Sequence, residues 1–69
     1  MNAEDLKKER LGLGYKTHKA LAEALGVSIW TVHSWEQGRR PIPAWVPKFL
    51  EVIAIVKGID DHGKSYLLH

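Results

Sequence analysis

The apolar residues of this chain recur at helical spacing in four successive stretches, with polar turn residues between them. The first stretch predicts a helix that runs to about Leu11 and buries Leu6 and Leu11. Asn2 can cap its start, and the glycines within residues 12–14 break it. The pattern predicts a chain built mainly of helices.

The second and third stretches predict two short helices joined by a tight turn. Thr17 caps a helix over residues 18–25, and Ser28 caps another that spans about residues 29–37. Gly26 lies between them, where glycine enters a left-handed turn at no steric cost. This arrangement is a helix-turn-helix, so DNA is the leading candidate ligand.

A helical wheel divides the third predicted helix into two faces. The inner face carries Thr31, Val32 and Trp35. The outer face carries Trp30, His33, Ser34 and Gln37. An outward indole favours a partner, either thymine methyl groups in a DNA groove or another protein surface. The alternative is that Trp30 folds back over the neighbouring helix.

The fourth stretch predicts a helix that starts near residue 44 or 45 and ends at Gly58, with Pro47 in its first turn. Its apolar residues cover more than the roughly 100° of helix surface that a core normally needs. The surplus favours a homodimer interface through Trp45, Val52 and Ile55. The alternative is that Val52 and Ile55 lie under the C-terminal tail.

Length and composition bound the domain organisation. The 69 residues allow one small domain, which we expect over residues 1–58. Residues 59–69 form a tail for which a strand, a last helical turn, a dimerisation element and partial disorder are open alternatives. The chain has no cysteine, no secretory signal and no apolar run near the roughly 20 residues that span a bilayer. We therefore expect a soluble cytoplasmic protein without membrane association.

The distribution of charge says more about a partner than the total does. The net charge of +2 permits nucleic-acid binding without requiring it. Most basic residues precede Pro41, and Arg39 and Arg40 lie in a proline-stiffened loop after the third predicted helix. Because solvated lysines are common on small helical domains, this asymmetry alone decides little.

The sequence offers no arrangement typical of catalysis. His18 and His33 lie on different predicted helices, with no carboxylate spaced for a metal face or an acid-base pair. A serine elbow, a Walker loop and a dinucleotide glycine pattern are also missing from the sequence. We expect a protein that is not an enzyme and that uses neither a cofactor nor a metal.

Thr17 to Gly38, read as THKALAEALGVSIWTVHSWEQG, resembles the helix-turn-helix of the XRE family of phage repressors and Cro proteins. The combined pattern of leucine, alanine-glutamate, glycine-valine-serine and tryptophan-glutamate-x-glycine is more specific than any of its pieces. It covers 22 residues directly. Flanking segments that resemble the family's first and fourth helices extend the coverage to about residues 6–53.

The resemblance implies a compact all-α, lambda-repressor-like domain of four helices, or five elements if the tail folds, with its third helix in the major groove. The family's base-reading positions fall on Ser28, Ile29, Trp30 and Ser34, with His33 and Gln37 as neighbouring candidates. Expected phosphate contacts are Thr17, His18, Lys19, Arg39 and Arg40. The resemblance also implies a structural ion pair between Arg10 and Glu36.

This sequence departs from the family at several expected contact positions. His18 stands where many relatives carry glutamine, and Ile29 and Trp30 stand where they carry glutamine or arginine. Bidentate reading of adenine or guanine is therefore weakened, and apolar recognition of thymine methyl groups is the natural substitute.

The expected function is that of a sequence-specific DNA-binding transcriptional regulator, a phage or prophage Cro-like repressor that binds a palindromic operator as a homodimer. Its two third helices would enter successive major grooves about 34 Å apart and block polymerase. The alternative from another class is a helical protein-interaction module, such as the antitoxin of a toxin-antitoxin pair, whose partner is a protein.

Overall fold

The computed structural model describes residues 1–58, and within them the fold is all-helical, as expected. The four helices are α1 (Ala3–Gly12), α2 (His18–Leu25), α3 (Ile29–Glu36) and α4 (Trp45–Lys57). The described part of the chain contains no strand. The alternatives for residues 59–69 lie outside the described residues.

Side-chain caps begin the first three helices, as the sequence predicts. The Asn2 side chain accepts a hydrogen bond from the Asp5 N–H at 2.8 Å, and the Thr17 hydroxyl accepts one from the Ala20 N–H at 3.0 Å. Ser28 accepts in the same way at the start of α3. Each cap satisfies a backbone donor that has no partner within its helix, and so fixes where the helix begins.

The helix ends differ slightly from the predicted ones. The α1 helix continues through Gly12 rather than breaking there, and α3 ends at Glu36, so Gln37 is the residue that caps it. The α4 helix begins at Trp45 without a side-chain cap and is followed by Gly58 in the left-handed conformation. Displacements of one residue are ordinary, because helix ends fray.

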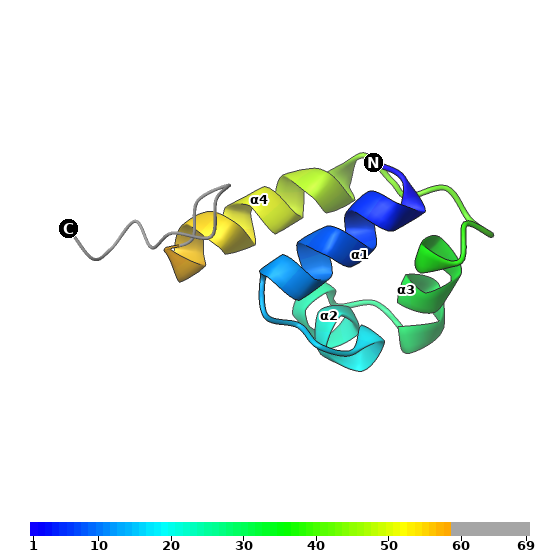
Figure 1. Cartoon of the computed structure of the whole chain (residues 1–69), viewed down its shortest axis with the longest axis horizontal. Coiled ribbons are helices and arrows are strands. Elements are labelled where there is room, and N and C mark those ends of the chain that lie inside the picture. The colour runs from blue at the N-terminus through cyan, green and yellow to red at the C-terminus, as the bar shows by residue number, and fades with distance from the viewer. Residues whose placement is uncertain (59–69) are drawn as a thin grey trace.

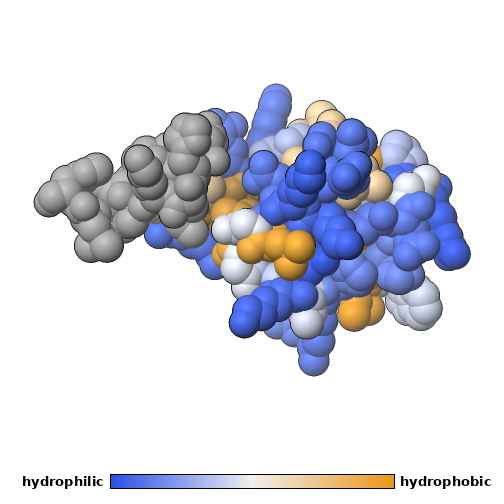
Figure 2. Space-filling view, viewed as in Figure 1, coloured by the Kyte–Doolittle hydropathy of each residue, from blue (hydrophilic) through white to orange (hydrophobic). Residues whose placement is uncertain are grey.

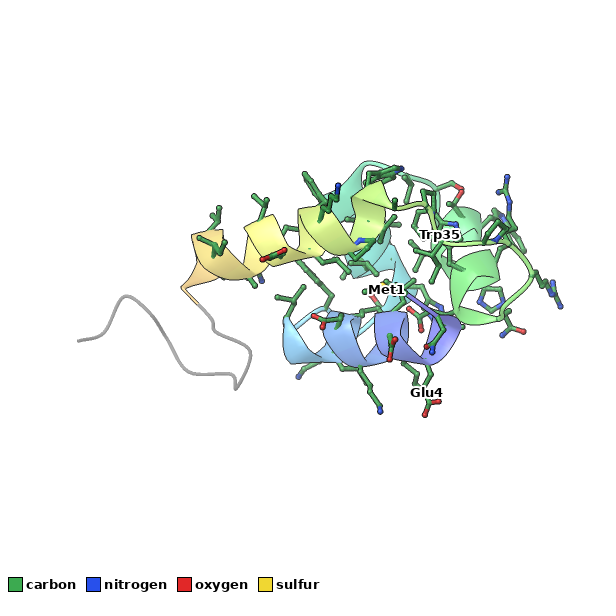
Figure 3. All side chains as sticks on the ribbon, turned by 90° about the horizontal axis from the view of Figure 1, so that it is seen from above. Met1, Glu4 and Trp35 are labelled. Carbon is green, nitrogen blue, oxygen red and sulfur yellow. The ribbon has the colours of Figure 1, made fainter. Side chains whose placement is uncertain are left out.

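The core lies between α1, α2, α3 and the first half of α4. Its buried hydrophobic residues are Leu6, Leu13, Leu21, Ala22, Leu25, Val32, Trp35, Val46 and Leu50. In Figure 3 the Trp35 side chain reaches from α3 toward the start of α4, where its ring meets Trp45 edge to face at a centroid distance of 6.2 Å. This contact closes the core at the end where the chain passes from α3 to α4.

One core prediction is wrong. Leu11 is 50% exposed, whereas Leu13, in the segment expected to be a break, is buried. Since Leu13 lies seven residues after Leu6, it returns to the same side of a helix that continues to Gly12. Leu11 is five residues from Leu6 and points away from that side.

The α1 and α4 helices run in the same direction, and α3 packs against α1 and α2 (Figures 1 and 3). The second half of α4 extends beyond the other helices. Lys57 ties its end back, because the ammonium donates to the Leu13 carbonyl at 3.0 Å and lies 4.4 Å from the centre of the Tyr15 ring. No helix within residues 1–58 has the length and apolar character needed to cross a bilayer.

Candidate nucleic-acid interface

A tight turn joins α2 to α3 and sets the position of the helix that follows it. Gly26 adopts the left-handed conformation with φ of 73°, and the Val27 N–H donates to the Ala22 carbonyl at 3.0 Å. Ala22 is buried one turn before Gly26. The turn therefore holds the first residues of α3 beside the first residues of α2.

The first turn of α3 is open to solvent. Trp30 is 73% exposed and Ile29 is 46% exposed, whereas Val32 on the other side of the helix is fully buried. The alternative that Trp30 folds back over a neighbouring helix is wrong, because that exposed fraction leaves most of its indole uncovered. An uncovered tryptophan on a helix fixed by its buried side is a typical feature of a binding surface.

The six predicted base-reading residues do not form one uniform row. Ser28 is exposed, but its hydroxyl serves the cap of α3 and lies 2.9 Å from the Thr31 hydroxyl. His33 and Ser34 are half-buried, and Gln37 is exposed just past the end of the helix. Ile29 and Trp30 therefore supply most of the freely exposed surface at the start of α3.

The start of α2 lies next to this surface. Thr17 and Lys19 are exposed, and Lys19 has no ion-pair partner among residues 1–58. His18 differs from the expectation, because its Nε2 lies 3.2 Å from Glu36 Oε1. Its imidazole is also edge to face with that of His33, with ring centres 5.3 Å apart. His18 therefore links α2 to α3 in addition to any phosphate contact that it makes.

The predicted ion pair between Arg10 and Glu36 is confirmed. Arg10 Nε donates to Glu36 Oε2 at 2.8 Å, and Arg10 Nη2 donates to Oε1 at 3.3 Å. Arg10 Nη1 donates to the Tyr15 carbonyl at 3.0 Å. The two side chains are only 7% and 5% exposed, so the pair is desolvated and well satisfied. It fixes the end of α3 against α1.

The sequence did not reveal that His18 shares this carboxylate. Residues 18 and 36 are far apart along the chain, and only the crossing of α2 over α3 brings them together. The only hint of this contact in the sequence is that residue 18 is polar, at the start of a helix whose other side is apolar.

The loop after α3 carries Arg39 and Arg40, both exposed. Gly38 turns the chain with φ of 75°, and the Arg39 N–H donates to the Ser34 carbonyl at 3.0 Å. The loop projects beyond α3 at the right-hand edge of Figure 1. Neither guanidinium forms an ion pair with a carboxylate of the described residues. Two positive charges that no carboxylate within residues 1–58 compensates therefore lie next to the end of α3.

The starts of α2 and α3 together enclose an open hollow of about 260 Å³ lined by His18, Ile29, Trp30 and His33. Figure 2 shows apolar surface at the lower edge of the molecule where α2 joins α3, within a face that is otherwise mostly hydrophilic. We call these four residues the α2–α3 hollow. It combines apolar walls with imidazole nitrogens, so it suits a ligand with both kinds of surface.

The predicted dimer residues lie on α4. Trp45 is partly covered, because its ring lies edge to face with Trp35 and with Phe49. Val52 is 53% and Ile55 is 60% exposed. Trp45 therefore belongs in part to the core, whereas Val52 and Ile55 form an apolar surface that residues 1–58 leave open.

Comparison of the chain with protein-family models, with curated proteins and with solved structures gave no match in any of the three searches.

Proposed function

We propose that the protein is a sequence-specific DNA-binding transcriptional regulator with a lambda-repressor-like helix-turn-helix of the XRE and Cro type. The observation that carries the proposal is the exposed first turn of α3, with Trp30 73% uncovered while the opposite side of the helix is locked in the core. A short helix that presents side chains in this way fits the major groove of B-DNA, which admits one α-helix.

Charge around that helix supports a nucleic-acid ligand. Lys19, Arg39 and Arg40 are exposed near the two ends of the helix-turn-helix and have no carboxylate partner within residues 1–58. The first turns of α2 and α3 contain no acidic residue, so their free backbone N–H groups and helix dipoles favour phosphate. Phosphate contacts of this kind orient a protein on the duplex, and the side chains of α3 then read the bases.

The proposed mechanism is steric repression by a homodimer. Two copies related by a two-fold axis bind a palindromic operator, with each α3 helix in one of two successive major grooves. The exposed apolar residues of α4, among them Val52 and Ile55, support self-association. A dimer seated on a promoter blocks polymerase, and this role needs no enzymatic activity, cofactor or metal. We place the protein in the cytoplasm, where the operator is.

Selection from a pool of random duplexes tests the proposal. Incubation of the full chain with the pool and recovery of bound DNA should enrich one sequence with two inverted half-sites. A gel-shift titration at two salt concentrations should then give tighter binding to the enriched duplex than to the starting pool at both. Recovery of DNA with no common sequence would contradict the proposal.

The second candidate function is a helical protein-interaction module, such as an antitoxin. It is favoured by the open apolar side of α4, where Phe49 and Val56 are also exposed. Such a module binds its partner through Trp30 and the apolar side of α4, and without a DNA-binding role it gives no enriched sequence in the selection experiment.

A further inference from the structure

The α2–α3 hollow has a chemical character that narrows what it can hold. Ile29 and the ring carbons of Trp30 form apolar walls that are largely exposed, and the polar side-chain atoms of the lining are the imidazole nitrogens of His18 and His33 and the indole N–H of Trp30. The ring of His33 lies edge to face with both His18 and Trp30, at centroid distances of 5.3 and 6.3 Å. The three rings therefore line the hollow in edge-to-face contact, and neither of these two contacts is a face-to-face stack.

The lining excludes several kinds of DNA contact. It contains no guanidinium or ammonium group, so it is not built for a phosphate. It also contains no arginine, lysine, asparagine or glutamine, the side chains that read guanine or adenine through two hydrogen bonds. Apolar contact is what Ile29 and Trp30 offer to the floor of a major groove.

We infer that the α2–α3 hollow receives the major-groove edge of a thymine, with the 5-methyl group against Ile29 and Trp30. Thymine presents an acceptor, O4, beside that methyl group, and it is the one unmodified base whose major-groove edge is apolar in part. The neutral His33 imidazole has one N–H that can donate to O4 or to the N7 of a neighbouring purine, whereas the Nε2 of His18 faces Glu36 Oε1. The inference rests on the proposed DNA-binding function and goes beyond it by naming the base and the side chains that recognise it.

The surroundings favour a base over a protein side chain as the occupant. The hollow opens between the first turns of two helices that lack acidic residues there, and Lys19 is exposed one residue after His18. This positive environment attracts a polyanion to the mouth of an otherwise uncharged hollow. A protein partner would have to place an apolar side chain there without using the positive charge.

The test removes the methyl group and nothing else. In a duplex obtained by selection from random DNA, each thymine is replaced in turn by deoxyuridine, which keeps O4 and the base pair. Replacement of the contacted thymine in one half-site should weaken binding about fourfold. This factor corresponds to about 0.8 kcal/mol, the free energy expected for one buried methyl group. Replacement in both half-sites should weaken binding by roughly the square of that factor.

Variants of the hollow complete the experiment. Trp30→Ala and Ile29→Ala should each reduce the ratio of thymine to uracil affinity toward one, because the walls that contact the methyl group are removed. Lys48→Ala, on the exposed surface of α4, should keep the ratio of the unchanged protein. Far-ultraviolet circular dichroism checks that each variant is folded. If Ile29→Ala does not fold, Trp30→Ala alone is enough for the test.

The outcomes separate this inference from the proposed function. Equal affinity after every thymine replacement, a selected site without thymine, or an unchanged ratio in Trp30→Ala would overturn the inference and leave sequence-specific binding intact. Failure to enrich any duplex would overturn both.

Discussion

Glu36 is the residue at which α1, α2 and α3 meet. Its carboxylate accepts from Arg10 on α1 through both oxygens, and Oε1 also lies 3.2 Å from His18 at the start of α2. All buried polar side-chain atoms within the described residues have a hydrogen-bond partner. Removing one member of such a group leaves another buried charge without its partner, which costs more than the pair contributes.

We therefore predict that Glu36→Gln destabilises the protein by about 3 kcal/mol, since the Arg10 guanidinium stays buried without a compensating charge. This is a large share of the 5–15 kcal/mol typical of a folded domain. Urea unfolding followed by circular dichroism measures it. Glu9→Gln is the matched control, because Glu9 is exposed and its side chain makes no ion pair within residues 1–58, and its effect should stay within about 0.5 kcal/mol. Equal effects of the two substitutions would show that the ion pair is unimportant for stability.

The left-handed backbone at Gly26 fixes the turn between α2 and α3. We predict that Gly26→Ala costs about 1–2 kcal/mol, because φ of 73° is unfavourable for a residue with a Cβ although the space around it is open. Gly12→Ala meets equally open space but has a helical backbone, so it should be neutral or slightly stabilising. Thermal unfolding of both variants gives the comparison, and a stabilised Gly26→Ala protein would contradict this account of the turn.

At the scale of the elements, the loop between α3 and α4 carries the clearest electrostatic prediction. Replacing both Arg39 and Arg40 with alanine should reduce the slope of log affinity against log salt concentration by about one to two. The reason is that binding releases fewer counterions from the DNA when phosphate contacts are lost. Fluorescence titrations of the selected duplex at several salt concentrations provide the slope. Lys48→Ala should leave it unchanged. The two arginines are not phosphate contacts if their removal leaves the slope as it was.

The local signals of the sequence were sufficient to predict the helices and most of their starts. A capping side chain acts within three residues, and glycine marks a left-handed turn, so Asn2, Thr17, Ser28 and Gly26 were identifiable from the sequence alone. The inner face of α3 followed from helical spacing, as burial of Val32 and Trp35 confirms. The ion pair of Arg10 and Glu36 came from a family resemblance rather than from any local rule.

Other features depended on packing that the sequence does not encode locally. The exchange of Leu11 for Leu13 in the core follows from one more residue of helix than the glycines suggested. The contact of His18 with Glu36, and with it the polar side of the α2–α3 hollow, exists only because α2 crosses α3 at a particular place. A wheel drawn for one helix cannot show which residues of another helix it meets.

At the scale of the whole molecule, the open side of α4 bears on assembly. Val52 and Ile55 are exposed and belong to the second half of α4 in the sequence. That half of the helix extends beyond the other helices (Figure 3). We predict that Val52→Glu shifts the protein from dimer to monomer, because a carboxylate in an apolar interface is costly to desolvate. Sedimentation equilibrium measures the change in mass. Lys8→Gln, an exposed substitution on α1 with the same change in net charge, should leave the dimer intact.

Val52→Glu should also weaken operator binding, because a dimer engages two half-sites at once and a monomer only one. Each monomer should stay folded, because Val52 is exposed. A Val52→Glu protein that stays dimeric would exclude this side of α4 from the interface. A protein that is monomeric both before and after the substitution would exclude the homodimer.

In the proposed complex the start of α3 enters the major groove of the DNA. Titration of ¹⁵N-labelled protein with its selected duplex, followed by amide chemical shifts, locates the surface that contacts the DNA. The largest changes should fall in residues 17–19 and 28–34, with smaller ones in the Arg39 and Arg40 loop. Large changes confined to α4, with residues 28–34 unaffected, would contradict it.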